Sequence, residues 1–203
     1  MTEIKKRVSA GVFAPNRLEF LTDGVFAIVM TLLVLEITLP EIAQPSLQAE
    51  MPQKLLELWP KLFIYILSFL VLGMLWGFHH LTFHSIKRSN MALAWLNLVF
   101  LMFVTLIPYS TSFRPVPPIT PSLASTLIYV LNIELAFAMI FTMWTYATGK
   151  HRLVDSNISP RVVKVYKWIV IGLLLFFILV IGISFIRVDI GNYLLAFGGV
   201  ASR

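Results

Sequence analysis

The sequence contains no cysteine, and only 13% of its 203 residues are charged. Without cysteine the chain has no disulfide framework, no thiolate zinc site and no thiol nucleophile. An ordinary soluble domain carries roughly a quarter charged residues, so this chain has too little polar surface to cover a compact body in water. It also lacks the sequence motifs of a serine nucleophile, a phosphate-binding P-loop and a dinucleotide-binding loop. These absences argue against a water-soluble protein and against an enzyme.

Hydrophobic residues make up 58% of the chain, and its mean hydropathy is +0.84. They gather in continuous runs of about 20 residues, the length of helix that crosses roughly 30 Å of hydrocarbon. Five such runs cover residues 18–39, 62–83, 91–109, 123–147 and 165–186. A sixth candidate, residues 190–200, is too short to span the membrane unless it is tilted, so we expect six spans and keep five as the alternative. Because the runs do not alternate with period two, they predict an all-α polytopic transmembrane helical bundle, a single domain over residues 1–203, and not a barrel.

The ends of three runs carry helix-boundary signals. Asn16 with Glu19 three residues later is typical of a capping box that opens the first helix, and Pro40 is expected to end it. Two further pairs each combine a capping side chain with a first-turn proline and predict the starts of the fourth and fifth helices. They are Thr120-Pro121 and Ser159-Pro160.

Basic residues exceed acidic ones by 16 to 10, which gives a formal net charge of +6. If the N-terminus is cytoplasmic, eleven of the 16 basic residues fall in cytoplasmic segments. They are Lys5, Lys6, Arg7, Arg17, Lys87, Arg88, Lys150, Arg152, Arg161, Lys164 and Lys167. This asymmetry follows the positive-inside rule and predicts a multi-pass protein of the cell membrane with a cytoplasmic N-terminus. The positive charge then indicates contact with anionic membrane lipids and not with nucleic acid.

Asp23 lies about two turns inside the first run, where an ionised carboxylate costs several kcal/mol unless it is paired or faces water. Partners are available in His79 and His80 near the end of the second run, and in Asn97 of the third. These polar groups are expected at one depth of the membrane. A buried hydrogen-bond cluster that locks the helices together and a proton relay are both consistent with them.

The first run also carries a stripe of apolar residues at helical spacing, with one hydroxyl beside it. Its members are Ile28, Thr31, Leu32 and Leu35. Such a stripe is typical of helix packing and is also compatible with a pore lining. Glu36, near the outer end of the same helix, favours a pore mouth, because a ring of carboxylates attracts cations. A single salt bridge between Glu36 and Lys61 is equally consistent with the sequence.

Histidines of the second run raise the question of a metal site. His80 and His84 are four residues apart and, with Asp23, would supply three ligands. The pair lacks the glutamate base of the H-E-x-x-H motif, so a membrane-embedded metal enzyme is the weakest of the alternatives. We expect no metal and no other cofactor.

The segment from Arg17 to Glu36 resembles the first helix of the bacterial members of the transmembrane protein 175 family of potassium channels. The family pattern R-x-x-x-F-S-D is present with Leu21 for Phe and Thr22 for Ser, and it ends in Asp23. The resemblance continues through the second and third runs, roughly the first half of the chain. The second half is similar only in length and hydropathy.

This resemblance implies a homotetramer in the bacterial inner membrane, in which the first helix of each subunit, about residues 17–39, lines a central pore for potassium ions. It implies that Ile28 forms a narrow hydrophobic constriction, that Leu32 and Leu35 form further apolar layers, and that Thr31 adds a hydroxyl layer. It also implies a structural polar network that holds the first helix to the second and third. The network consists of Arg17, Thr22, Asp23, His79 or His80, and Asn97.

The alternative function is a proton-coupled secondary transporter that uses Asp23 and His79 or His80 as proton carriers. Transporters of this kind are commonly built from repeated halves with broken helices. The sequence has no recognisable internal repeat. A potassium-selective cation channel is therefore the favoured prediction.

Overall fold

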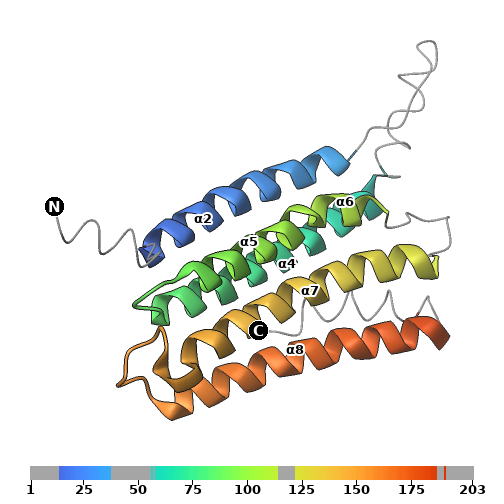
Figure 1. The fold of residues 1–203 in the computed structure, drawn as a ribbon. Helices are drawn as coiled ribbons and strands as arrows, with labels where there is room; N and C mark the ends of the chain where they lie inside the picture. The colour runs from blue at the N-terminus through green and yellow to red at the C-terminus, as the bar shows by residue number, and fades with distance from the viewer. Residues whose placement is uncertain (1–13, 38–55, 57, 114–121, 187–189, 191–203) are drawn as a thin grey trace, which may run out of the picture.

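The computed structural model describes residues 14–37, 56, 58–113, 122–186 and 190, and this part of the chain is a bundle of aligned helices (Figure 1). The elements are α2 (Pro15–Leu32), the 3-10 helix η1 (Leu33–Glu36), α4 (Trp59–Ser85), α5 (Met91–Thr105), α6 (Ile107–Ser112), α7 (Leu123–Thr148), the 3-10 helix η3 (Gly149–His151) and α8 (Pro160–Ile186). Within the described residues, five helical segments are long and apolar enough to cross a membrane, with α5 and α6 together forming one of them. The five predicted runs are therefore confirmed as helices. The sixth candidate, residues 190–200, lies outside the described residues except for Ile190.

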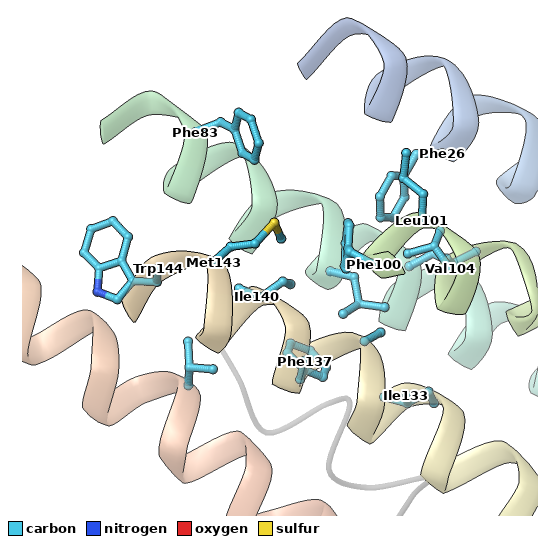
Figure 2. Packing of buried hydrophobic residues seen from close by; sticks show 14 of the residues in the cluster. Phe26, Phe83, Phe100, Leu101, Val104, Ile133, Phe137, Ile140, Met143 and Trp144 are labelled. Atoms are coloured by element: carbon cyan, nitrogen blue, oxygen red, sulfur yellow. The ribbon is translucent and has the colours of Figure 1, made fainter. Parts of the chain in front are cut away.

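Helix α7 forms the centre of the bundle, between α5 on one side and α8 on the other. Half of its apolar stretch is buried, whereas only 22% of the apolar stretch of α8 is buried. Figure 2 shows Ile133, Phe137, Ile140, Met143 and Trp144 of α7 directed into this core. Because most of the apolar surface of α8 is left uncovered by the described residues, the helix is suited to the periphery of a membrane protein, in contact with lipid.

The predicted capping box at Asn16 and Glu19 is wrong. Helix α2 begins at Pro15, its N-cap residue is Ala14, and no side chain caps it. A proline is favoured at the first helical position because its fixed φ suits the helix and its missing N–H leaves no donor to satisfy. The Glu19 carboxylate instead lies beside His80. At the other end α2 tightens into η1 at Leu33, and the predicted terminator Pro40 lies outside the described residues.

The third predicted run, residues 91–109, is divided into α5 and α6. The division falls at Leu106, whose N–H bonds to the carbonyl groups of Phe103 and Val104 at the end of α5. Pro108 follows two residues later, in the first turn of α6. Its ring has no N–H and collides with the carbonyl of residue 104 in a continuous helix, which accounts for the break.

The starts of α7 and α8 test the two proline-based predictions. Helix α8 begins at Pro160, as the Ser159-Pro160 pair predicts. Helix α7 begins at Leu123, and its cap is Ser122, whose side chain accepts a hydrogen bond from the Ser125 N–H. The prediction of Thr120 as the cap is therefore wrong, and both Thr120 and Pro121 lie outside the described residues.

A chain of buried polar side chains holds α6 against α4 and α7. The Thr111 hydroxyl donates to Ser68 Oγ at 3.2 Å, and Ser68 Oγ lies 3.2 Å from the Tyr129 hydroxyl. Asn132 Nδ2 donates to Ser110 Oγ at 3.2 Å. These contacts satisfy polar groups that hydrocarbon cannot satisfy, and they fix the segment beyond the break at Leu106.

Candidate functional site

Helix α2 and η1 have two faces of different character. One face packs on α4 and α5 and contains the buried residues Leu18, Thr22, Phe26, Val29 and Leu33. Phe26 contacts Phe100 of α5, with ring centroids 6.0 Å apart (Figure 2). The five buried residues of α2 and η1 follow one another at intervals of three or four, as expected for a helix that packs on the bundle along one side.

A second, exposed face of α2 and η1 carries the stripe predicted from the sequence. Ile28 is 61% exposed, Leu32 is 44% exposed and Leu35 is 68% exposed. Thr31 is exposed beside them, and its hydroxyl donates to the Ile28 carbonyl at 2.7 Å. Because its proton is used within the helix, the Thr31 oxygen presents lone pairs on this face. Glu36 is partly buried at the end of η1. Among the residues that the structure describes, this face of α2 is left without a packing partner.

The buried face of α2 contains a three-residue hydrogen-bond cluster, here named the buried cluster, formed by Thr22, His79 and Asn97. His79 Nε2 lies 2.8 Å from Asn97 Oδ1, and Asn97 Nδ2 donates to Thr22 Oγ1 at 3.1 Å. Thr22 Oγ1 in turn lies 3.0 Å from the Leu18 carbonyl, to which it donates. Because Asn97 Oδ1 only accepts, this arrangement assigns the imidazole proton to Nε2 of His79. The hydrogen bonds run from His79 of α4 through Asn97 of α5 to Thr22 of α2, so the cluster links these three helices.

The three side chains of the buried cluster are shielded from water, so the loss of one of their hydrogen bonds would destabilise the protein. The exposed fractions of Thr22, His79 and Asn97 are 0%, 1% and 0%. The His79 ring is stacked on Phe83 at 4.3 Å and on Phe100 at 5.2 Å. Water therefore has no access to replace a lost partner, and each unpaired group would carry its full desolvation penalty.

A second set of contacts, here named the indole chain, lies next to the buried cluster and contains Asp23, Trp76, His80 and Glu19. Trp76 Nε1 donates to Asp23 Oδ1 at 2.8 Å. The Trp76 ring is stacked on His80 at 5.7 Å, and His80 Nδ1 lies 3.1 Å from Glu19 Oε1. The two adjacent histidines thus have different partners: His79 joins the buried cluster and His80 pairs with a carboxylate on α2.

The resemblance implied one network of Arg17, Thr22, Asp23, His79 or His80, and Asn97, and the structure divides these residues between different sets of contacts. The hydrogen bond to Asp23 comes from Trp76, which the sequence argument gave no role, and not from a histidine or Asn97. The pairing of Glu19 with His80 was also missed, although Glu19 lies one turn before Asp23 on the same helix. Arg17 borders a surface pocket between α2 and α5, and the structure does not bring it together with the other predicted members.

The predicted metal alternative finds no matching geometry. Among residues 14–37, 58–113 and 122–186, no three His, Asp or Glu side chains meet as ligands. The rings of His80 and His84 are 6.5 Å apart, while His80 is paired with Glu19 and Asp23 is bonded to an indole. The arrangement therefore gives no support to a metal-dependent enzyme.

Comparison with known proteins was made once this geometry was established. Residues 17–108 match the family described as endosomal/lysosomal potassium channel TMEM175. A potassium channel of Streptomyces collinus is 33% identical over 147 residues, which cover 71% of this chain and 69% of that protein. A potassium channel of Chamaesiphon minutus is 32% identical over 158 residues, which cover 75% and 77% of the two chains.

The fold is also similar to a solved structure. The crystal structure of a lysosomal potassium-selective channel TMEM175 homolog from Chamaesiphon minutus superimposes with a TM-score of 0.79 at 24% identity. The superposition covers 92% of this chain and 94% of that one. The similarity of fold thus includes the second half of the chain, where the sequence resemblance was limited to length and hydropathy.

Proposed function

The chain belongs to the TMEM175 family of ion channels, and from this membership we propose that it is a potassium channel whose pore is lined by α2. Membership makes it a multi-pass membrane protein and not an enzyme. The observation that best supports α2 as the pore helix is its exposed stripe, Ile28, Leu32 and Leu35, on a face separate from the buried cluster.

In the proposed channel four subunits surround a central axis, with the stripe of each α2 turned toward that axis. The buried cluster holds the other face of α2 against α4 and α5, which directs the stripe away from its own subunit. Exposure alone is also compatible with contact to lipid. Thr31 and Glu36 favour the pore, because hydroxyl and carboxylate oxygens reduce the cost of admitting a cation, and hydrocarbon offers them no partner.

The mechanism follows from what these side chains are able to do. A ring of Ile28 side chains has no oxygen atoms with which to coordinate a cation, so the constriction selects by width and by the cost of removing water from the ion. Potassium loses its hydration water at lower cost than sodium, and it therefore passes more readily. Leu32 and Leu35 extend the apolar wall, where water tends to leave a narrow channel and so stops conduction. Thr31 oxygens next to the constriction supply a polar layer that assists partial dehydration.

We assign the buried cluster and the indole chain a structural role in this mechanism. A constriction only a few ångströms wide changes its selectivity if its walls shift, so each α2 must keep a fixed rotation and depth. Hydrogen bonds from Asn97 to Thr22 and from Trp76 to Asp23 provide that restraint at two neighbouring positions of the helix.

Replacing Asp23 with alanine is therefore expected to reduce the amount of assembled channel more than it changes ion preference. The substitution removes the acceptor of the Trp76 N–H and with it a contact that ties α2 to α4; because Trp76 is 41% exposed, the expected cost is that of an ordinary hydrogen bond, about 0.5 to 1.5 kcal/mol. Asp23→Asn keeps an oxygen at the same place and serves as the matched control, with assembly close to that of the parent chain. Size-exclusion chromatography of the extracted protein measures assembly, and ion flux measures preference. A fully assembled Asp23→Ala channel with altered potassium over sodium preference would contradict the structural role.

The transporter alternative used Asp23 with His79 or His80 as proton carriers. Asp23 accepts its hydrogen bond from an indole, which does not exchange protons in the physiological range, and His79 Nε2 is bonded to an amide oxygen. Within the described part of the chain, no hydrogen bond joins Asp23 to either histidine. The geometry therefore favours the channel over the transporter.

We propose that the N-terminus faces the cytoplasm and that the protein lies in a bacterial inner membrane. The loops between α4 and α5 and between α7 and α8 lie at the end of the bundle where α2 begins (Figure 1). Lys87, Arg88, Lys150 and Arg152 all belong to these loops. Clustering of basic residues at one end supports a cytoplasmic location of that end.

The proposal is tested by ion flux into liposomes that contain the purified full-length chain. We expect a potassium gradient to drive flux without any second solute, and we expect sodium to pass more slowly in the same preparation. Absence of flux, or flux that requires a counter-substrate or a proton gradient, would contradict the channel.

A further inference from the structure

Two loops at one end of the bundle are joined by backbone hydrogen bonds. The N–H groups of Lys87 and Arg88 both donate to the Leu153 carbonyl, at 2.8 and 3.1 Å, and Ile86 forms an isolated antiparallel bridge with Val154. We name residues 86–90 and 149–154 the loop clasp. In Figure 1 the two loops lie at the end where α2 begins. The clasp therefore fixes two surface loops in one arrangement.

Burial and further hydrogen bonds hold the clasp in this arrangement. Leu153 and Val154 are only 4% and 1% exposed, and the Leu153 N–H donates to the Ala147 carbonyl at 3.0 Å. The Arg88 guanidinium donates to the His151 carbonyl at 3.3 Å across the two loops. An ordered loop pair of this kind holds its side chains at defined positions, unlike a flexible basic tail.

Backbone strain occurs at the centre of the clasp. Lys150 and His151 have φ values of 52° and 50°, in the left-handed region that residues with a Cβ rarely adopt. Such conformations persist only where the surrounding contacts over-determine them, and they are frequent at ligand-binding sites. Gly149 precedes them, yet the two strained positions are occupied by a lysine and a histidine.

The charge of the clasp is of one sign. Four permanently charged side chains project from it, all exposed: Lys87, Arg88, Lys150 and Arg152. No acidic residue occurs in residues 86–90 or 149–154. The nearest in sequence, Asp155, uses Oδ1 to accept the Asn157 N–H at 2.9 Å. The Arg152 guanidinium is placed over the Tyr146 ring, 4.5 Å from its centroid. A compact cationic surface is thus available to an anion.

The position of the loop clasp relative to the membrane boundary indicates which anion it binds. The clasp connects the ends of membrane-spanning helices, so its charges lie where the hydrocarbon ends. Trp168, 62% exposed about two turns into α8, has the position of an interfacial indole. Lysine and arginine just outside such an indole lie at the level of lipid phosphates. We propose that the loop clasp is a binding site for the phosphate headgroup of an anionic phospholipid.

The proposal is tested with purified full-length protein in mild detergent, titrated with phosphatidylglycerol and, separately, with phosphatidylcholine. Bound lipid is counted by native mass spectrometry. The clasp variant is Lys87→Gln with Lys150→Asn, because neither side chain has a hydrogen-bond partner among the described residues and asparagine tolerates a left-handed backbone. The matched control is Arg161→Gln with Lys164→Gln, which removes the same charge from the exposed start of α8.

We expect the parent chain to retain phosphatidylglycerol in preference to phosphatidylcholine. Each lysine near an anionic surface contributes about a fivefold change in affinity, so the clasp variant should need on the order of 20-fold more phosphatidylglycerol for equal occupancy. The control should titrate like the parent, and Lys87→Arg with Lys150→Arg should retain binding. Equal losses in the clasp variant and the control would overturn the proposal in favour of diffuse attraction. Equal retention of the two lipids, or displacement of phosphatidylglycerol by millimolar inorganic phosphate, would overturn it as well.

Discussion

Replacing Ile28 with asparagine will increase ion flux through the channel and reduce its preference for potassium over sodium. The proposed constriction excludes ions because apolar side chains neither coordinate a cation nor hold water in a narrow passage. In the proposed tetramer, an amide at each of the four positions supplies oxygens and retains water. Lowering the barrier by about 1.4 kcal/mol is sufficient for a tenfold increase in rate. Flux of potassium and of sodium into liposomes, measured on the same preparation, gives both quantities.

A conservative variant separates chemistry from size at this position. Ile28→Val shortens the side chain but keeps it apolar, so we expect a modest change in flux and a preserved preference for potassium. If Ile28→Asn leaves the ratio of potassium to sodium flux unchanged, Ile28 does not belong to the selective part of the pore.

Replacing Asn97 with leucine will strongly destabilise the protein. Asn97 accepts from His79 and donates to Thr22, so its loss leaves the buried His79 N–H without its acceptor in a region that water does not reach. The Thr22 hydroxyl keeps the Leu18 carbonyl as its acceptor, whereas an orphaned buried donor costs about 1 to 3 kcal/mol. We expect a lower melting temperature and little assembled protein after extraction, both measurable by size-exclusion chromatography after heating.

A second asparagine provides the matched control for this prediction. Asn132 is also nearly buried, but the structure shows it donating to Ser110 Oγ, which itself donates to the Ile107 carbonyl. In Asn132→Leu the Ser110 hydroxyl still has an acceptor for its proton, so this variant should lower the melting temperature less than Asn97→Leu does. Equal melting temperatures for the two variants would contradict the importance assigned to the buried cluster.

The helices were predictable from the sequence because hydrocarbon imposes long apolar runs and leaves few alternatives to a helix. Their ends were harder to predict. Asn16 and Glu19 have the spacing of a capping box, but α2 begins at Pro15, two residues before the start that this box predicts, and both side chains lie inside the helix. Pro108 could have predicted the break at Leu106, but the run is apolar throughout and its hydropathy predicts one continuous helix.

The candidate site was predictable in its members but not in its pairings. His79 and His80 are neighbours in sequence, and a helix directs them about 100° apart, so only the packing of α4 decides which one meets Asn97. The structure turns His79 into the bundle and His80 toward Glu19. Trp76 gave no sequence signal as a partner of Asp23, because an aromatic residue near a membrane boundary is usually an interfacial anchor.

The sequence alone could not predict the role of the apolar stripe of α2, Ile28, Leu32 and Leu35. Ile28, Leu32 and Leu35 have the spacing of a packing seam, and composition alone does not distinguish a seam from a pore lining. In the described part of the chain they are not used for packing, since the buried seam of α2 and η1 consists of other residues: Leu18, Thr22, Phe26, Val29 and Leu33. What the stripe faces is a property of the assembly, and it is therefore the point at which the account is most directly tested.

Substitution of Ile28 by cysteine tests that point, since the chain has no other cysteine. Ag⁺ is a monovalent ion that binds thiolates tightly, and it reaches a side chain only through water. We predict that Ag⁺ blocks potassium flux through the Ile28→Cys channel and has no effect on the parent chain or on Leu179→Cys, which replaces an exposed residue of the peripheral helix α8. Unchanged flux through Ile28→Cys in Ag⁺, with its thiol still free afterwards, would place this face of α2 against lipid and contradict the proposed pore.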